Sequence, residues 1–323
     1  MRIVVIGATG HIGTFLIPRL VRAGHEVVTI SRGTRSAYVD APEWQSVEQI
    51  TADREAEDRD GTFPDRVAAL RPDVVVDLIS FTLESSTALV ERLRGTVGHL
   101  VFCGSIWRAG ESRILPMTES NATPPFGEYG VQKDRIARML AEETAHGGLV
   151  TTSLHPGHIS GPGWAPIGPT GNLDPAVWQT LAAGAPLAVP GLGTETMHHV
   201  HADDVAQSFE RAIEHRDAAA GQDFFITAAD AFTVRGYAET AAAWFGQEAR
   251  LEHVSWDTFR SGLDPEHAET SWAHLVRSQF FSMAKATALI GYAPAHSVAD
   301  TALEAVRSLI ERGELVVERP LVV

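Results

Sequence analysis

The chain has a single cysteine, an excess of acidic over basic residues and no long apolar run. Cys103 has no second cysteine to pair with, which excludes an intramolecular disulfide and fits a reducing compartment. The 26 Lys and Arg residues are outnumbered by 41 Asp and Glu residues, giving a net charge of −15. That balance argues against a nucleic-acid or anionic-membrane surface. No run reaches the about 18 apolar residues of a membrane span, and no signal-peptide pattern opens the chain. We therefore expect a cytoplasmic protein without nucleic-acid or membrane partners.

What is present is an ordinary globular composition, with 44% hydrophobic and 21% charged residues among 323. Apolar β-branched runs alternate with amphipathic helical patterns from residue 2 to residue 156. This alternation predicts an α/β fold, a Rossmann-type doubly wound parallel sheet. After residue 157 the pattern becomes rich in Gly and Pro, and we expect "HISGPGWAPIGPTGN" to be a loop. We expect a dinucleotide-binding domain over 1–156 with return segments near 196–227, and a smaller substrate-binding region over 157–195 and 228–323.

A glycine-rich turn follows the first predicted strand. In "RIVVIGATGHIG", three glycines are spaced three residues apart, between a strand and a helix. Glycine permits a tight turn and lets backbone N–H groups approach a pyrophosphate at a helix N-terminus. The bare spacing differs from the commonest dinucleotide fingerprint, but its position predicts nucleotide binding. The residues expected at the cofactor here are Gly7, Thr9, Gly10, His11, Ile12 and Gly13.

The ends of the next strands offer further cofactor contacts. The second strand ends in Ser31 and Arg32, with Arg35 nearby and no acid. An acid at this place commonly binds the ribose hydroxyls of NAD, whereas an arginine suits the 2′-phosphate of NADP, so NADP(H) is favoured and NAD(H) stays possible. Asp53 after the third strand is a candidate for the adenine amino group. Leu78 and Ser80 end the fourth strand, where a cofactor would also lie.

Tyr129 and Lys133 in "EYGVQK" are four residues apart at the start of a predicted helix. Residues at this spacing lie on one helix face. A neighbouring positive charge favours the phenolate, so we expect Lys133 to lower the pKa of Tyr129 towards neutral pH. The pair would then serve as a general acid or base.

Together these segments resemble the extended short-chain dehydrogenase/reductase family, also called the NAD-dependent epimerase/dehydratase family. The resemblance rests on "GATGHIG", a fifth strand ending at Ser105, the Y-x-x-x-K helix, "HPGHISGPG" and "VHADDVA", in that order, and on "KATALIGYAP" near the end. It implies that Tyr129 exchanges a proton with a substrate carbonyl or hydroxyl. It also implies that Lys133 binds the nicotinamide ribose and that Ser105 holds the same substrate oxygen. The "HPG" segment adds His155 and Gly157 to the cofactor contacts. A homodimer is a further expectation.

Departures from the family pattern narrow the reaction. Ile106 and Trp107 follow Ser105 where dehydratases and decarboxylases of the family carry an acid. Met197 stands near the place where sugar-nucleotide epimerases carry a phosphate-binding arginine. The first departure argues against a dehydratase or decarboxylase, and the second argues against a sugar-nucleotide substrate.

Several aromatic and histidine side chains fall in segments expected around the cleft. Trp107, Trp164 and Trp178 would suit a ring-shaped or ketone substrate, and His158 is a candidate substrate contact. The histidines of "HHVH" match no metalloenzyme spacing, so we expect no metal.

The sequence therefore predicts an NAD(P)-dependent oxidoreductase that acts on an alcohol or ketone carbon of a small molecule, as a ketone or aldehyde reductase or a dehydrogenase. One alternative is a sugar or nucleotide-sugar epimerase with tightly held NAD. Another is a non-enzymatic, cofactor-sensing or RNA-associated relative, because "SRG" and "ADRE" resemble the chloroplast stem-loop-binding branch.

Overall fold

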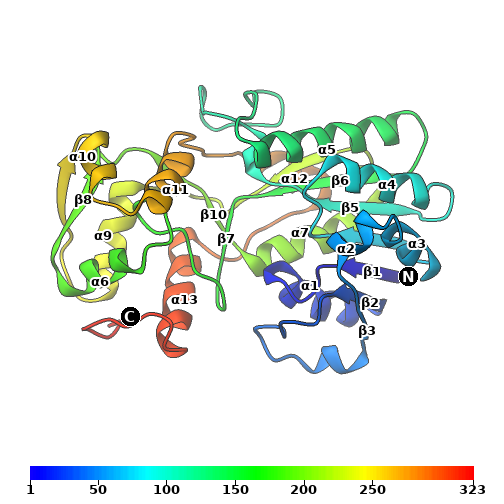
Figure 1. Ribbon diagram of the computed structural model, residues 1–323, viewed down its shortest axis with the longest axis horizontal. Helices are drawn as coiled ribbons and strands as arrows, with labels where there is room; N and C mark the ends of the chain where they lie inside the picture. The colour runs from blue at the N-terminus through cyan, green and yellow to red at the C-terminus, as the bar shows by residue number, and fades with distance from the viewer.

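A seven-stranded parallel sheet forms the centre of one half of the molecule (Figure 1) in the computed structural model, which describes residues 1–323. The strand order is β11-β6-β5-β4-β1-β2-β3. Strand β1 pairs with both β2 and β4, so the order of connection reverses there. Open α/β sheets bind ligands at such a reversal, outside the carboxyl ends of the strands. The strands are β1 (Arg2–Ile6), β2 (Glu26–Ser31), β3 (Glu48–Thr51), β4 (Val74–Asp77), β5 (His99–Cys103), β6 (Thr151–Pro156) and β11 (Asp223–Ile226).

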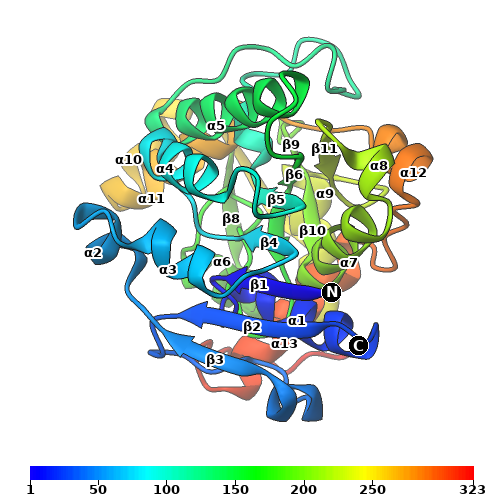
Figure 2. The ribbon, with the colours of Figure 1, turned by 90° about the vertical axis from the view of Figure 1, so that its right-hand side faces the viewer.

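Helices cover both faces of this sheet (Figure 2), as the alternation of strand and helix patterns predicted. Apolar side chains of the inner strands are buried between the two helical layers, which gives the continuous β-branched runs seen in the sequence. The helices of one face are α1 (His11–Arg22), α7 (Ala202–Glu214) and α12 (Ala284–Ile290). Those of the other are α3 (Phe63–Ala69), α4 (Leu83–Leu93) and α5 (Glu128–Ala145).

A second apolar core lies in the other half of the molecule, at the left of Figure 1. Trp178 is buried in it between Tyr237 and Trp244, so its predicted place at the cleft is wrong. Trp178 lies on the apolar face of a helix, and this face packs into the second core. This half contains α6 (Pro175–Ala183), β8 (Pro186–Pro190), α9 (Val234–Trp244), β13 (Arg250–Val254), α10 (Trp256–Ser261), α11 (Pro265–Leu275) and α13 (Val298–Glu311).

Two short parallel strands, β7 (His158–Ser160) and β10 (His199–His201), lie between the halves in Figure 1. The segment from residue 158 was expected to be loop, and this part of the prediction is wrong. The backbone of these three residues finds its hydrogen-bond partners in a segment about 40 residues away, which no local pattern reveals. No helix in the structure combines the length and the apolar character needed to cross a bilayer. The remaining short elements are η1 (Pro42–Ser46), α2 (Arg54–Arg59), η2 (Ile106–Arg108), β9 (Thr196–Met197), α8 (Arg216–Ala219) and β12 (Phe232–Thr233).

Candidate active site

The glycine turn between β1 and α1 is built by contacts that only glycine permits. Gly7 has a φ of +86°, and a Cβ there would lie 2.6 Å from the side chain of Ile79. A Cβ on Gly13 would lie 2.0 Å from the carbonyl oxygen of Ala8. Gly10 is the N-cap of α1, whose first turn holds no acid. The N-terminus of this 12-residue helix is therefore open to an anion, as a bound diphosphate requires.

A cavity of about 850 Å³ opens at the carboxyl ends of β1 to β4. This volume lies within the range of cofactor and small-molecule sites. Of the residues predicted at the cofactor, the cavity is lined by Gly7, Thr9, Gly10, Ser31, Arg32 and Asp53. His11 and Ile12 are buried directly behind the turn.

The arginines of this cavity differ in their pairing. Arg54 is buried and donates to Asp77 at 2.6 Å and to Asp58 at 3.3 Å. Arg59 lies 3.6 Å from Glu55. Arg32 and Arg35 line the cavity without a carboxylate partner. The end of β2 thus presents two uncompensated guanidinium groups, which suit a phosphate.

Asp53, Ser80 and Leu78 have local partners that the sequence reading missed. The Asp53 carboxylate caps α2 by accepting from the amide of Ala56 at 3.1 Å. The Ser80 hydroxyl is fully buried and bonds to Ser86 and Arg54. Leu78 packs against the core beneath the sheet, and Ile79 lines the cavity instead. Asp53 can still reach a ligand, whereas Leu78 and the Ser80 side chain face the protein.

Lys133 is 1% exposed, and its ammonium group is held by the backbone. Its Nζ donates to the carbonyl oxygens of Ser80 and Cys103, each at 2.8 Å. Burial lowers the pKa of Lys133. The ammonium therefore ties the end of β5 to the chain that follows β4, beside the cavity.

Tyr129 lies one helical turn before Lys133, with the ammonium 5.7 Å from its ring centre. Burial raises the pKa of Tyr129 to about 12, and a hydrogen bond with Ser105 opposes this rise. We predicted that Lys133 lowers the pKa of Tyr129, and in the cofactor-free protein this prediction is wrong. The Lys133 ammonium is bound to two carbonyl oxygens and not to the phenol. Since Tyr129 keeps 42% of its surface exposed, solvent moderates the rise in its pKa.

Ser105 follows β5, and its hydroxyl lies near enough to the Tyr129 phenol to oppose the rise of the phenol pKa. Its hydroxyl accepts from the amide of Trp107 at 3.2 Å, which starts the short helix η2. Its own amide donates to Nδ1 of His155 at 3.3 Å, and Nε2 of His155 lies 3.3 Å from Arg108. The imidazole of His155 thus lies beneath Ser105. His155 therefore supports the turn at Ser105, and its contact with the cofactor stays a prediction.

Gly157 likewise lies apart from the residues that line the cavity. Its amide donates to Ile226 at 2.9 Å, and a Cβ there would lie 2.4 Å from the carbonyl oxygen of His198. Glycine is needed here for the close approach of β6 and the chain before β10.

The three predicted substrate residues lie in different places. Trp107 packs edge-to-face on Tyr129, with ring centres 5.9 Å apart. His158 is linked to Trp107 through His274, and neither of its ring nitrogens has a hydrogen-bond partner. Trp164 lines the dinucleotide cavity instead. Trp107 and His158 therefore stay candidates for substrate binding, and Trp164 is a candidate for the cofactor.

Arg277 is a residue of this site that sequence reasoning missed. Its guanidinium stacks between Trp107 and Phe126, at 4.0 and 3.9 Å from the ring centres, and it is 2% exposed. It donates to the carbonyl oxygens of Ala273 and Phe126 and has no carboxylate partner. Burial lowers its pKa to about 10. Arg277 therefore fixes the ring that covers Tyr129, and a lone arginine in "LVRSQFF" carries no sequence signal for this role.

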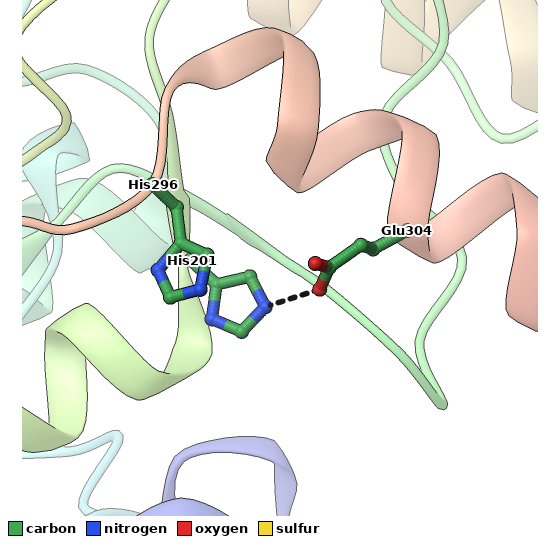
Figure 3. Close-up of side chains that lie close together, drawn as sticks. All are labelled: His201, His296 and Glu304. Carbon is green, nitrogen blue, oxygen red and sulfur yellow. Dashed lines mark hydrogen bonds and ion pairs between the residues drawn. The ribbon is translucent and has the colours of Figure 1, made fainter. Parts of the chain in front are cut away.

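His201, His296 and Glu304 come together in a cluster (Figure 3). Nδ1 of His201 accepts from the amide of Asp203 at 3.0 Å, so its proton lies on Nε2, which donates to Glu304 at 3.1 Å. His296 stacks on this ring at 3.9 Å and bonds to Asp204. Because both nitrogens of His201 are engaged, we assign the cluster as a hydrogen-bonded link between α7 and α13 and place no metal there.

Comparisons with known proteins agree with this architecture. The sequence model of the NAD-dependent epimerase/dehydratase family matches residues 3–227. The chain is 29% identical to a 2′-dehydrokanamycin reductase of Streptomyces kanamyceticus over 205 residues, which cover 63% of this chain and 55% of the reductase. It is 24% identical to the chloroplast stem-loop binding protein of 41 kDa b of Arabidopsis thaliana, over 91% of this chain and 75% of that protein.

Solved structures show the same fold. A UDP-glucose 4-epimerase of Thermus thermophilus in complex with NAD superposes with a TM-score of 0.71 at 19% identity, covering 96% of this chain and 99% of the epimerase. The family match spans the glycine turn, helix α5 with Tyr129 and Lys133, and the "VHADDVA" segment. The chain therefore belongs to the NAD-dependent epimerase/dehydratase family of extended short-chain dehydrogenases.

Proposed function

We propose that the protein is an NADP(H)-dependent reductase of a ketone or aldehyde carbon in a small molecule. The observation that supports it most is the position of the Tyr129 phenol, near Ser105 and beside the dinucleotide cavity. Phe81 lines that cavity, and its ring centre lies 6.4 Å from that of Tyr129. A phenol is protonated at neutral pH and can therefore donate its proton to a substrate oxygen, as reduction requires.

A reduced nicotinamide, when bound in the cavity, supplies the hydride. Tyr129 donates its hydroxyl proton to the substrate oxygen as that oxygen gains negative charge. The Ser105 hydroxyl bonds to the same oxygen and fixes its position. Lys133 keeps the ends of β4 and β5 together by donating to the carbonyl oxygens of Ser80 and Cys103, and this fixes the position of Ser105, which follows β5.

Tyr129→Phe tests the catalytic assignment. We expect turnover of any reducible substrate to be lost while NADPH binding is kept, since the glycine turn is untouched. Full activity of this variant would overturn the assignment.

The cofactor preference rests on Arg32 and Arg35, the unpaired arginines at the end of β2. Calorimetric titration should show NADPH bound at least tenfold tighter than NADH, about 1.4 kcal/mol. Arg32→Ala should reduce this preference, whereas Arg59→Ala is the matched control, because Arg59 lines the same cavity but is paired with Glu55. Tighter binding of NADH, or NAD that co-purifies without exchange, would favour the epimerase alternative.

The fold of the solved relatives supports the epimerase alternative. The place where sugar-nucleotide epimerases carry a phosphate-binding arginine does not support it. Met197, near the expected phosphate-binding arginine, is fully buried in β9. RNA association, suggested by the name of the Arabidopsis relative, is tested by filter binding to structured RNA at two salt concentrations. Salt-sensitive retention would support it.

A further inference from the structure

Trp164 belongs to the segment that follows β6 and reaches the glycine turn. The chain leaves β6, forms β7 (His158–Ser160), and then bends at Gly161 and Gly163, where φ is +131° and +86°. Trp164 follows these bends and lines the same cavity as Gly10. It keeps 40% of its surface exposed, which is high for an indole that faces a cavity.

The indole of Trp164 stacks on the imidazole of His11, with ring centres 5.2 Å apart and planes 12° apart. His11 is the first residue of α1, directly after Gly10. Tyr38 packs edge-on against both rings, at 5.8 Å from His11 and 6.3 Å from Trp164. The three rings therefore gather beside the helix N-terminus that is open to an anion.

His11 itself points to a missing partner at this place. It is 6% exposed, and neither of its ring nitrogens has a hydrogen bond of good geometry, although the Pro162 carbonyl lies close enough to act on its pKa. Burial and the nearby His201 lower the pKa of His11 to about 3, and the Pro162 carbonyl opposes this shift in part, so the ring is neutral at working pH. A neutral imidazole carries one N–H donor, and a buried donor with a poorly placed acceptor is costly. A phosphate oxygen at the start of α1 would offer it a further acceptor.

The segment before Trp164 is held by α13, a helix of the half of the molecule that contains the second apolar core. The amide of Gly163 donates to the Ser308 hydroxyl in α13 at 3.0 Å. A Cβ on Gly163 would lie 2.5 Å from the Tyr38 ring, and one on Gly161 would lie 2.9 Å from His201. These contacts leave little freedom, so the indole is presented to the cavity by a fixed support.

We propose that Trp164 is a cofactor-binding residue that covers the diphosphate of the bound dinucleotide, with His11 stacked behind it as its support. The indole would exclude water from the diphosphate at the N-terminus of α1 and offer its N–H to a phosphate oxygen. The segment that carries Trp164, held by α13, would thereby supply one wall of the cofactor site. This inference rests on dinucleotide binding in the cavity and is independent of the direction of the reaction and of the choice between NADPH and NADH.

The test is calorimetric titration of wild type and Trp164→Ala with NADPH, NADH, ADP-ribose and 2′-AMP. We expect Trp164→Ala to weaken the first three about tenfold, since all contain the diphosphate, and to leave 2′-AMP unchanged. Loss of Arg32, in contrast, should affect only ligands with a 2′-phosphate. The two proposals therefore fail separately.

Trp272→Ala is the matched control, because Trp272 is 41% exposed and packs on Phe126, away from the residues that line the cavity. It should bind all four ligands like wild type. Wild-type dissociation constants for NADPH, NADH and ADP-ribose in Trp164→Ala would overturn the proposal. So would an equal loss of 2′-AMP binding.

If Trp164→Ala unfolds, Trp164→Phe provides the answer. ADP-ribose should quench the indole emission of wild type and of Trp272→Ala but not that of Trp164→Phe. Equal quenching in all three proteins would refute a contact between Trp164 and the diphosphate.

Discussion

The ionisation of Tyr129 gives the sharpest prediction, because sequence and structure point in opposite directions. An ordinary phenol has a pKa near 10, and burial raises that of Tyr129 to about 12. Two units correspond to about 2.7 kcal/mol in favour of the neutral phenol. With 42% of the residue exposed, solvent screening reduces this figure, and we take about half of it. The expected midpoint therefore lies above the ordinary value near 10.

The assay is an ultraviolet titration of phenolate in the cofactor-free protein. Subtracting the Tyr129→Phe titration removes the signals of Tyr38, Tyr237 and Tyr292. The difference should show no phenolate below about pH 10. Lys133→Met should leave the midpoint in place, since the ammonium binds the carbonyl oxygens of Ser80 and Cys103. A midpoint below 10, or one that rises in Lys133→Met, would refute the reasoning, with circular dichroism confirming that each protein stays folded.

Three further predictions concern the supports of the site. Gly13→Ala should abolish cofactor binding in calorimetry, because its Cβ would lie 2.0 Å from a carbonyl oxygen of the same turn; an unchanged dissociation constant would contradict this. Arg54→Met should cost about 3–5 kcal/mol in urea unfolding, since it leaves the Asp77 carboxylate buried without its cation; a loss near zero would show that the pair is dispensable. Asp204 raises the pKa of His296, so this histidine's contribution to stability is complete below pH 6.5 and is lost as pH rises through the raised value. The melting temperature of wild type should therefore fall more steeply above pH 6.5 than that of His296→Gln, and equal slopes would sink the idea.

The sheet and its cofactor turn could be predicted from the sequence because both are local. The inner strands β1, β4 and β5 are buried on both faces and read as apolar runs, whereas the edge strand β3 is largely exposed. The glycine turn is short, and Gly7 and Gly13 are required by contacts within it or next to it. Ser105 and Tyr129 were singled out from ordered motifs; their side chains lie near each other, and their catalytic role stays a prediction.

The contacts that the sequence did not predict have a common cause, which is that the partner is distant in sequence. The ammonium of Lys133 is bound to carbonyl groups 30 and 53 residues away and not to the Tyr129 phenol. His155 accepts a hydrogen bond from the Ser105 amide, 50 residues earlier. Trp164 meets His11, more than 150 residues before it. No spacing rule contains these contacts.

The charge states around Tyr129 lead to a consequence for substrate choice. Burial lowers the pKa of His158 and His199, and that of His274 to about 4, so these histidines are neutral at physiological pH. Arg277 is the buried cation among them, and its guanidinium lies behind Trp107. Neutral imidazoles donate one hydrogen bond and accept another, as hydroxyl groups do. A substrate that meets these side chains would be selected by its hydrogen-bonding pattern, and its binding should vary little between pH 6 and 8, because no histidine of the group changes charge in that interval.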